Sequence, residues 1–443
     1  MYSLHEQGSK IVYQDRIEDV KISVDRQQCL GLIGFKEPPA VSWPEDFRAA
    51  FASPAGTPLL RDLARGAGRV AIIVSDSTRG VPTAKAMPMI MEELASAGVR
   101  KSDITVVIAT GVHRQATEDE VIDIVGKEYL DDELQVISHD PCDTDKLVYV
   151  GKTRFGTPIE VSKTVFDADL RISVGKVEPH EFAGFSGGRK SVLPGIASQR
   201  TIEINHRPEM LMSPEARPGQ ILDNPIHQDM LEAAQMVKLH FTVNLVLNQA
   251  GETAGIFAGD LIEAHLAAVR FMRSFCQISL TTRPDIIVTT PGSPLNINFY
   301  QSVKPLIALG PVMASGGVLV LYSSCQDGLG TEDMLIPYEG ARDIEEVIHR
   351  LNSEYRIQMD HALLLGKILV RGIRIVVSSP SVKASILNNM FMHAAESPQE
   401  AVKKAMNMVS NQEPAVLFFP QAQRALSVLA STKEPSRHHS AQA

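Results

Sequence analysis

Short runs of Val and Ile, each followed by a polar loop and then a helix-like segment, constrain the fold of this 443-residue chain more than any other feature. Continuous apolar runs are typical of strands buried on both faces of a parallel sheet, and their alternation with helical segments predicts α/β layers. The predicted strands are residues 69–74, 104–109 and 170–174 in the first half, and 285–290, 317–322, 373–378 and 415–419 in the second half.

Helical segments are predicted between these strands. Thr117 is a suitable N-cap for one of them, because Glu120 completes a capping box with it. Two glycines, Gly151 and Gly156, indicate a hairpin or a pair of short strands between residues 147–150 and 158–161. The predicted helices cover residues 82–97, 117–125, 303–313, 343–351 and 398–409.

The strand–helix pattern starts again near residue 276, which predicts two domains. We expect an N-terminal cofactor-binding catalytic domain at residues 1–275 and a C-terminal α/β domain at residues 276–430, with a mobile tail at residues 431–443. Both domains have parallel-type sheets in this α/β interpretation, and the active site is expected in the cleft between the domains.

Composition excludes several classes of protein. The net charge of −9 comes with no basic block, which argues against a nucleic-acid partner. No apolar run approaches the roughly 20 residues that span a bilayer, and the polar N-terminus lacks the apolar stretch of a secretory signal. The 4 cysteines are scattered without a CxxC pair, as expected in a reducing cytoplasm. We therefore expect a cytoplasmic protein that binds neither nucleic acid nor membranes.

Reactive side chains follow the three predicted strands of the first half. Asp76 and Arg79 follow the first strand, His113 follows the second and His180 follows the third. Ligands of open α/β sheets bind at the carboxyl ends of the strands, so these side chains converge if the strands are neighbours. A single histidine in a loop is more often structural or solvated than catalytic, but three such loops together favour a functional site.

The run from Glu178 to Lys190 is the richest in the chain. Gly187 and Gly188 allow positive φ, so their backbone N–H groups could bind a phosphate or a carboxylate, and Lys190 adds a charge or a nucleophilic amine. Neither GxxxxGK[ST] nor GxGxxG occurs, so an ordinary ATP or NAD site is poorly supported. A Gly-Gly-x-Lys sequence by itself is equally compatible with a tight turn and an exposed lysine.

Two further segments carry candidate residues. A short helix with Ser198 as N-cap is predicted to end at His206. In the second half, Tyr300 or Gln301 and Lys304 are three or four residues apart and share a face on a helix. A polar face of this kind suits recognition of an anion, and it is also compatible with the solvated start of a helix.

These motifs together resemble the lactate racemase family. The resemblance covers residues 76 to 304 and rests on Asp76-Ser77-Thr78-Arg79, Gly111-Val112-His113-Arg114, the run from Glu178-Pro179-His180 through Gly187-Gly188-Arg189-Lys190 to His206, and Tyr300-Gln301 with Lys304. It implies a two-domain α/β racemase or epimerase that inverts C2 of a small 2-hydroxy acid, lactate or a related hydroxy acid. The implied reaction is reversible hydride transfer to a nickel-pincer nucleotide, a Ni(II) pyridinium-3,5-bisthiocarboxylic acid mononucleotide supplied by separate maturation enzymes.

The resemblance also implies a role for each matched residue. It implies His113 and His180 as the acid/base pair; Arg79, Tyr300, Gln301 and Lys304 as substrate-binding residues; Lys190 as the covalent tether through a thioamide; Asp76, Gly187 and Gly188 as cofactor-binding residues; and His206 as the nickel ligand. Chemistry agrees with these roles, because inversion of a hydroxylated carbon requires one proton acceptor for each enantiomer and two imidazoles of near-neutral pKa provide them. A single protein histidine suffices for nickel when the cofactor itself supplies the other ligands.

Two other classes of protein remain open from the sequence. The first is a metal-dependent hydrolase that uses His113, His180 and His206, which predicts bound metal without a covalent adduct. The second is a non-catalytic protein that binds an anion or a nucleotide, in which Lys190 only contacts phosphate. A covalent adduct on Lys190 distinguishes the racemase hypothesis from both.

Overall fold

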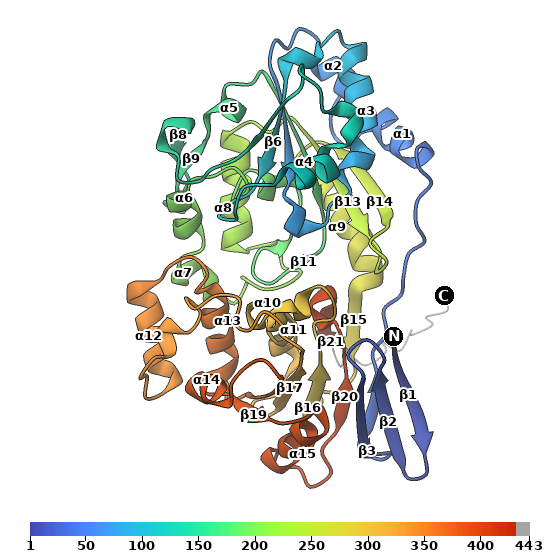
Figure 1. Cartoon of the computed structure of the whole chain (residues 1–443), viewed down its shortest axis with the longest axis vertical. Coiled ribbons are helices and arrows are strands. Elements are labelled where there is room, and N and C mark those ends of the chain that lie inside the picture. Colours follow the sequence, from blue (N-terminus) through green and yellow to red (C-terminus); the bar gives the residue numbers. More distant parts are fainter. Residues whose placement is uncertain (431–443) are drawn as a thin grey trace, which may run out of the picture. The chain divides into compact units, whose positions relative to one another are not determined.

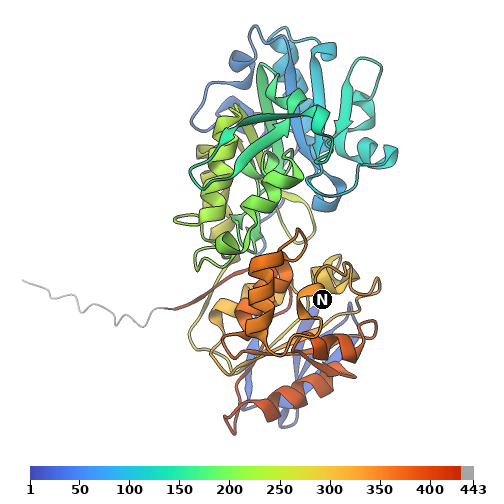
Figure 2. The ribbon, with the colours of Figure 1, turned by 90° about the vertical axis from the view of Figure 1, so that its left-hand side faces the viewer.

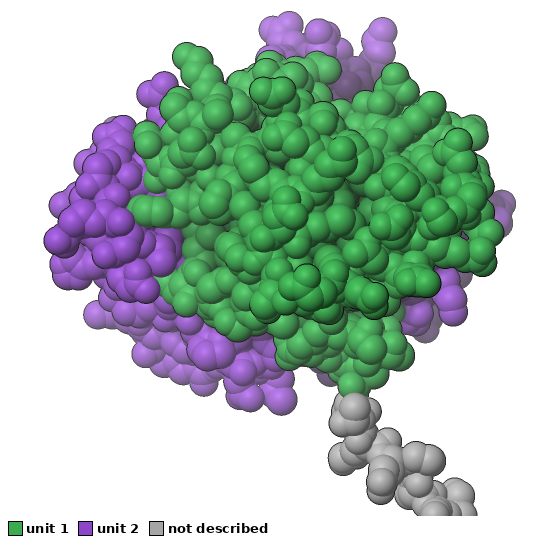
Figure 3. Space-filling model, turned by 90° about the horizontal axis from the view of Figure 1, so that it is seen from below, with its two compact units in different colours: residues 1–34, 277–330, 368–443 green, residues 35–276, 331–367 purple. Residues whose placement is uncertain are grey.

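The computed structural model describes residues 1–430, and these form two compact units (Figure 3). Unit 1 comprises Met1–Gly34, Gln277–Gly330 and the chain from Ile368 onward, whereas unit 2 comprises Phe35–Cys276 and Thr331–Lys367. The predicted tail at residues 431–443 lies outside the described residues. Each unit contains its own sheet and its own apolar core.

Unit 2 is built on a sheet with the strand order β14-β13-β10-β5-β6-β7. Every neighbouring pair is parallel except β13 and β14, which are antiparallel. The predicted strands 69–74, 104–109 and 170–174 are confirmed as β5, β6 and β10, and they are adjacent in the sheet. The bounds are β5 Val70–Ser75, β6 Ile104–Ala109, β7 Gln135–Ser138, β10 Leu170–Lys176, β13 Phe241–Leu247 and β14 Thr253–Gly259.

Helices flank this sheet in both ribbon views (Figure 1 and Figure 2). The predicted capping box is confirmed at α4, because the Thr117 hydroxyl accepts from the N–H of Glu120 and the Glu120 carboxylate accepts from the N–H of Thr117. The predicted hairpin is also confirmed, as antiparallel β8 (Leu147–Lys152) and β9 (Pro158–Ser162). The helices are α1 Glu45–Ala52, α2 Leu60–Leu63, α3 Thr83–Ser96, α4 Glu118–Val125, α5 Lys163–Phe166, α6 Gln199–Asn205, α7 Pro208–Leu211, α8 Pro225–Met236, α9 Glu263–Cys276 and α12 Ile344–Glu354, and α13 Asp360–Leu369 continues into unit 1.

Unit 1 is built on a second sheet, with the order β19-β18-β17-β16-β20-β4 and parallel pairing throughout. All the strands predicted in the second half of the sequence occur in it. The strands are β4 Cys29–Leu32, β16 Ile286–Thr289, β17 Val318–Tyr322, β18 Arg374–Ser378, β19 His393–Ala395 and β20 Val416–Phe418; the pair β15 Gln277–Leu280 and β21 Leu426–Leu429 and the helices α10 Phe299–Ser302, α11 Lys304–Leu309, α14 Ala384–Asn389 and α15 Pro398–Met408 complete the unit.

The two units differ from the predicted domains in two segments. Residues 1–34 belong to unit 1 and residues 331–367 to unit 2, so neither unit is a continuous stretch of chain, unlike the predicted domains. The physical cause at the second segment is local packing, because α12 contacts α7 and the Lys367 ammonium donates to the carbonyl oxygens of Leu211 and Ser213 at 2.8 and 3.2 Å. Such contacts between residues far apart in sequence leave no periodic signal.

An antiparallel sheet near the N-terminus accounts for the first segment. Its strands are β1 Tyr2–Gln7, β2 Lys10–Asp15 and β3 Val20–Asp25, which were not predicted from the sequence. Alternate residues of β2 and β3, including Tyr13 and Ile22, are buried against β16, β17 and α15. The sheet has one apolar face, and that face is covered by the rest of unit 1.

A buried polar network links this N-terminal sheet to β17. The Tyr13 hydroxyl lies 2.7 Å from the Tyr322 hydroxyl, which donates to the Asp15 carboxylate at 3.0 Å. The other Asp15 oxygen accepts from the N–H of Ile17 at 2.8 Å. Burial raises the pKa of both tyrosines well above the ordinary value, so the hydroxyls remain protonated and continue to donate.

Substitution Tyr322→Phe is therefore expected to destabilise unit 1. It removes two buried hydrogen bonds and leaves the Asp15 carboxylate under-satisfied, so the free energy of unfolding should fall by about 1–3 kcal/mol. Equilibrium urea unfolding measures this change. Substitution Tyr2→Phe, at a partly exposed hydroxyl 3.2 Å from the Gln421 amide, is the control and should cost much less. Equal losses in the two variants would contradict the role of the network.

Candidate active site

Three reactive loops follow adjacent strands of unit 2. Because β10, β5 and β6 are parallel neighbours, the loops after them leave from the same edge of the sheet. A fourth segment, the 3-10 turn Gly188–Ser191, packs against β5 and β10. The chain after this turn also reaches the second loop, where the N–H of Gly111 donates to the carbonyl oxygen of Gly195 at 3.0 Å. The loops that carry the candidate residues therefore lie at one edge of the sheet, as the sequence predicted.

Asp76 and His113 form a hydrogen-bonded pair across two of these loops. The Asp76 carboxylate lies 2.7 Å from Nδ1 of His113 and also accepts from the backbone N–H and the hydroxyl of Thr78, at 3.0 and 2.6 Å. Burial acts to raise the pKa of Asp76, but the hydrogen bonds from His113 and Thr78 outweigh it and lower the pKa. The ionised carboxylate accepts the Nδ1 proton of His113 and leaves Nε2 available for proton transfer.

Glu120 connects the same two loops from the start of α4. Its carboxylate accepts from the Ser77 hydroxyl at 2.7 Å and from both terminal nitrogens of Arg114 at 2.7 and 2.6 Å. These hydrogen bonds, chiefly those from Arg114, lower the pKa of Glu120 far below its usual range. Arg79, at the end of the first loop, is exposed. From the sequence, Glu120 was predicted only as part of a helix cap.

Lys190 and His180 form the second pair. The Lys190 ammonium nitrogen lies 3.1 Å from Nε2 of His180, and Nδ1 of the same imidazole lies 3.3 Å from the Glu181 carboxylate. An ammonium group can only donate, so Nε2 of His180 accepts from Lys190, whereas Nδ1 lies 3.4 Å from the backbone N–H of Ala183 as well as facing the Glu181 carboxylate. The order amine, imidazole, carboxylate matches the arrangement of nucleophile, base and orienting acid found in covalent catalysis.

The aromatic ring of Phe182 lies beside His180, Lys190 and His206, three of the residues predicted for cofactor and proton chemistry. Its centroid lies 4.6 Å from that of His180 and 5.0 Å from that of His206, both nearly perpendicular, and Lys190 Nζ lies 5.7 Å from it. Phe182 is buried, with 4% of its surface exposed. Phe182 was not predicted as a site residue, because an apolar residue within a charged run has no distinguishing sequence pattern.

His206 is held as a neutral imidazole. It follows α6, and its Nδ1 lies 2.9 Å from the Ile202 carbonyl oxygen. A carbonyl can only accept, so Nδ1 carries the proton and Nε2 keeps its lone pair. Burial, together with the charge of Lys190, lowers the pKa of His206 to about 4. The predicted helix with Ser198 as N-cap is confirmed.

Gly187 and Gly188 have the predicted positive φ values, 82° and 50°. A Cβ on Gly187 would lie 2.5 Å from a methyl of Val177 and 2.8 Å from the side-chain oxygen of Asn244, so the backbone approach requires glycine. The predicted anion-binding N–H of Gly188 is engaged within the protein, because it donates to Asn244 at 2.9 Å. Close packing therefore requires glycine at Gly187, the positive φ favours glycine at Gly188, and the N–H of Gly188 is bonded to Asn244.

The Arg189 side chain is buried beside the Lys190 turn. Its guanidinium donates to the carbonyl oxygens of Ala183 and Phe185 at 2.8 and 2.7 Å and lies 2.9 Å from Nε2 of His265. Burial lowers the pKa of Arg189 to about 9, which leaves the group charged at neutral pH. Burial and then the Arg189 charge lower the pKa of His265 to about 3 and that of His227 to about 2.

Tyr300, Gln301 and Lys304 lie in unit 1, after β16. Asn298 caps α10 by accepting from the N–H of Gln301 at 2.9 Å. Val303, between α10 and α11, keeps helical dihedral angles, so Tyr300 and Lys304 are on successive turns of a nearly continuous helix, as predicted. All three candidate side chains are partly exposed.

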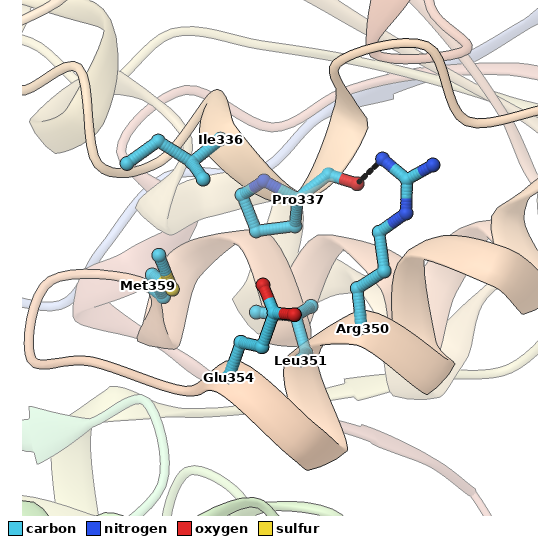
Figure 4. Close-up of a pocket in the computed structure, with 6 residues that line it drawn as sticks. All are labelled: Ile336, Pro337, Arg350, Leu351, Glu354 and Met359. Atoms are coloured by element: carbon cyan, nitrogen blue, oxygen red, sulfur yellow. Dashed lines mark hydrogen bonds between the residues drawn. The ribbon is translucent and has the colours of Figure 1, made fainter.

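A cavity of about 270 Å³ occurs elsewhere in unit 2 and contains none of these residues (Figure 4). The Arg350 guanidinium at this cavity donates to the Glu339 carbonyl oxygen and the Glu346 carboxylate, both at 2.6 Å. Its positive charge is therefore paired within the protein. The cavity is lined by Ile336, Pro337, Arg350, Leu351, Glu354 and Met359.

Comparisons with known proteins agree with the arrangement of motifs. Residues 14–219 match the model of the lactate racemase N-terminal domain, and residues 280–425 match that of the lactate racemase C-terminal domain. The chain belongs to the lactate racemase family. Lactate racemases from Thermoanaerobacterium thermosaccharolyticum and Lactiplantibacillus plantarum are each 34% identical to it; the matches cover 82% of this chain and 86% and 85% of those relatives. As a member of this family, the chain is an isomerase of the racemase class.

Solved structures agree with this family assignment. The structure of the lactate racemase apoprotein from Thermoanaerobacterium thermosaccharolyticum has a TM-score of 0.85 and 32% identity, and the match covers 92% of this chain and 97% of that one. A protein from Thermotoga maritima shares the fold at a TM-score of 0.63 and 19% identity, covering 85% of this chain and 100% of that one. The mixed α/β fold is thus that of the lactate racemase family.

Two features of residues 1–430 bear on other functions. No helix in that range is long and apolar enough to cross a membrane. No group of three or more His, Cys, Asp or Glu side chains in the described part of the chain is placed to hold a metal ion. His113, His180 and His206, the ligand set of the metal-hydrolase hypothesis, therefore do not form such a group.

The buried histidines are expected to make folding sensitive to acid. The pKa of His265 and that of His227 are lower in the folded protein than the ordinary value near 6.5. The unfolded chain therefore binds more protons below that pH, and stability should be highest above pH 6.5 and fall as the pH is lowered. Thermal unfolding midpoints measured from pH 7.5 to 4.5 test this expectation.

Substitution His227→Phe should make the unfolding midpoint less dependent on pH over that interval, because one of the groups that titrate only after unfolding is removed. Substitution His5→Gln, at an exposed histidine, is the control and should keep the wild-type dependence. A His227→Phe profile parallel to that of the wild type would show that this histidine does not contribute.

Proposed function

We propose that this chain inverts C2 of a small 2-hydroxy acid, lactate or a related hydroxy acid, with a nickel-pincer nucleotide tethered to Lys190. The observation that carries the proposal is the arrangement of Lys190, His180 and His206 around the single ring of Phe182. An amine for attachment, an imidazole base and an imidazole with a free lone pair are thereby brought to one place in unit 2. The cofactor reaches the chain from separate maturation enzymes.

The chemistry of the donors fits this cofactor. A metal ligand must be a neutral imidazole, and His206 meets that condition with its Nδ1 proton on Ile202 and its Nε2 lone pair available. A hydrogen bond from the other ring nitrogen to a carbonyl is the usual partner of a ligating histidine. The buried amide nitrogen of Asn244, beside the Lys190 turn, has no hydrogen-bond partner among the described residues and is a donor for a polar group.

In this proposal, side chains of the protein accept and return the proton of the substrate hydroxyl. When bound, the cofactor supplies the acceptor and donor for the hydrogen on C2. His113 takes or returns the hydroxyl proton of one enantiomer and His180 that of the other, because inversion requires a base on each face. Asp76 keeps His113 in the tautomer whose Nε2 is available, which is a positioning role rather than direct cofactor contact.

Substrate binding is proposed for Arg79 in unit 2 and for Tyr300, Gln301 and Lys304 in unit 1. Arg79 and Lys304 supply positive charges suited to a carboxylate, and Tyr300 and Gln301 add hydrogen-bonding groups. These assignments rest on the family motif and on partial exposure of the unit 1 side chains. Gly187 and Gly188 serve the cofactor through the shape of the turn that carries Lys190.

The covalent tether is the first point to test. Intact mass and nickel analysis, on protein produced together with the maturation enzymes, should give a nucleotide-sized adduct and about one nickel per chain, as expected for a tethered cofactor that carries one metal. Lys190→Ala should carry no adduct because the amine is missing. Lys176→Ala, at a neighbouring lysine paired with Glu178, is the matched control and should keep the adduct. Unmodified wild-type protein under these conditions would contradict the proposed function.

The acid/base role of His113 gives a second test. His113→Asn should keep the adduct and lose racemisation by roughly 10²–10⁴-fold, the usual contribution of a general acid/base. Asp76→Asn should lower the rate without affecting the adduct, because it removes the carboxylate that orients His113. Asp103→Asn, at a surface carboxylate paired with Arg100, is its control. Near-normal racemisation in His113→Asn would exclude this assignment.

A further inference from the structure

We propose that His180 and Glu181 form a proton relay that attaches the cofactor to Lys190, so that the chain catalyses its own modification. This inference rests on the proposed function, because it requires a thiocarboxylate group to be presented to Lys190. It gives His180 a role that precedes racemisation and gives Glu181 a role that neither the motifs nor the comparisons assign.

The contacts place the three groups in the order that such a relay requires. Lys190 Nζ lies 3.1 Å from Nε2 of His180, and Nδ1 of His180 lies 3.3 Å from the Glu181 carboxylate and 3.4 Å from the backbone N–H of Ala183. The His180 and Glu181 side chains are 18% and 14% exposed, so bulk water is a poor competitor for the proton. The perpendicular ring of Phe182, 4.6 Å away, restrains the imidazole.

Attachment needs an unprotonated amine, and the relay provides one. His180 Nε2 accepts a proton from the Lys190 ammonium, while the Glu181 carboxylate stabilises the resulting imidazolium through Nδ1. The Nζ lone pair then forms a bond to the thiocarboxylate carbon. The carbon–oxygen bond breaks, and the oxygen leaves as water.

The atoms of this condensation balance without another reactant. Of the three protons on the Lys190 ammonium, one stays on the thioamide nitrogen and two leave with the oxygen as water. One of these two is the proton that passes through His180, which returns it to the departing oxygen. No oxidant or reductant is involved, because carbon and sulfur keep their oxidation states.

Attachment also changes what His180 can do next. In the structure, its Nε2 is occupied by the ammonium of Lys190 and is not available to a substrate hydroxyl. Conversion of the ammonium to a neutral thioamide removes that donor cation and releases Nε2. The same nitrogen therefore acts first in attachment and then in racemisation. This order is required because the Lys190 ammonium contacts Nε2 until attachment is complete.

His113 provides a matched control within the same unit. Its Nδ1 lies 2.7 Å from Asp76 and 3.4 Å from the Thr78 hydroxyl, and it has no hydrogen bond to Lys190 in the described part of the chain. Both histidines are proposed for racemisation, but only His180 contacts the amine. The two residues should therefore differ in attachment and agree in racemisation.

The experiment follows attachment directly rather than activity. Cofactor-free protein is mixed with saturating purified nickel-pincer nucleotide, and the covalent adduct is followed over time by intact mass. His180→Gln and His180→Asn should slow attachment by roughly a hundredfold or more, as expected for removal of a general base. Glu181→Gln should slow it by roughly tenfold or more, because the imidazole loses its orienting carboxylate. His113→Asn should attach at close to the wild-type rate.

The outcomes separate this inference from the proposed function. Wild-type protein that forms no adduct would overturn the proposed function and the inference with it. Wild-type rates in Glu181→Gln and both His180 variants would overturn the inference alone and leave the tether intact. Thermal unfolding and noncovalent nickel retention, measured on each variant, establish that a slow variant is folded and binds the cofactor before attachment.

Discussion

The buried guanidinium of Arg189 is the interaction on which the candidate site depends. A charge of this kind is costly to bury without a carboxylate, and here the compensation comes from backbone carbonyl oxygens, including those of Ala183 and Phe185. These carbonyls belong to the loop that carries His180 and Phe182, and Arg189 itself precedes Lys190. The same hydrogen bonds therefore shape the loop and fix the position of the reactive amine beside it.

The histidines of the site acquire different properties from their partners. His113 faces the Asp76 carboxylate through Nδ1, whereas His180 faces Glu181 through Nδ1 and Lys190 through Nε2. His206 donates to a carbonyl oxygen and is kept neutral mainly by burial. Under the proposed function, one residue type thus provides a base, a base coupled to an amine and a metal donor, because the second nitrogen of each ring has a different neighbour.

Much of the fold could be predicted from residue patterns. The Val- and Ile-rich runs became β5, β6 and β10 as predicted, because buried parallel strands need apolar residues on both faces. The N-terminal strands were missed, although alternate residues such as Tyr13 and Ile22 are buried. Their alternation is weak in a polar segment, and the apolar face is completed only by β16, β17 and α15. The discontinuous composition of the two units was not predicted either, because it depends on contacts between segments far apart in the sequence.

The sequence by itself determined the α/β class, the candidate residues in the loops after the strands and the need for glycine at Gly187 and Gly188. These properties depend on local periodicity and backbone freedom. Tertiary structure alone decided that Phe182 contacts two histidines and a lysine, that Asn244 occupies the N–H of Gly188, and that Glu181 lies behind His180. The direction of a side chain in a folded loop is set by contacts between segments that are distant in the sequence. Such contacts produce no periodic pattern, so they cannot be predicted from the sequence of a single chain.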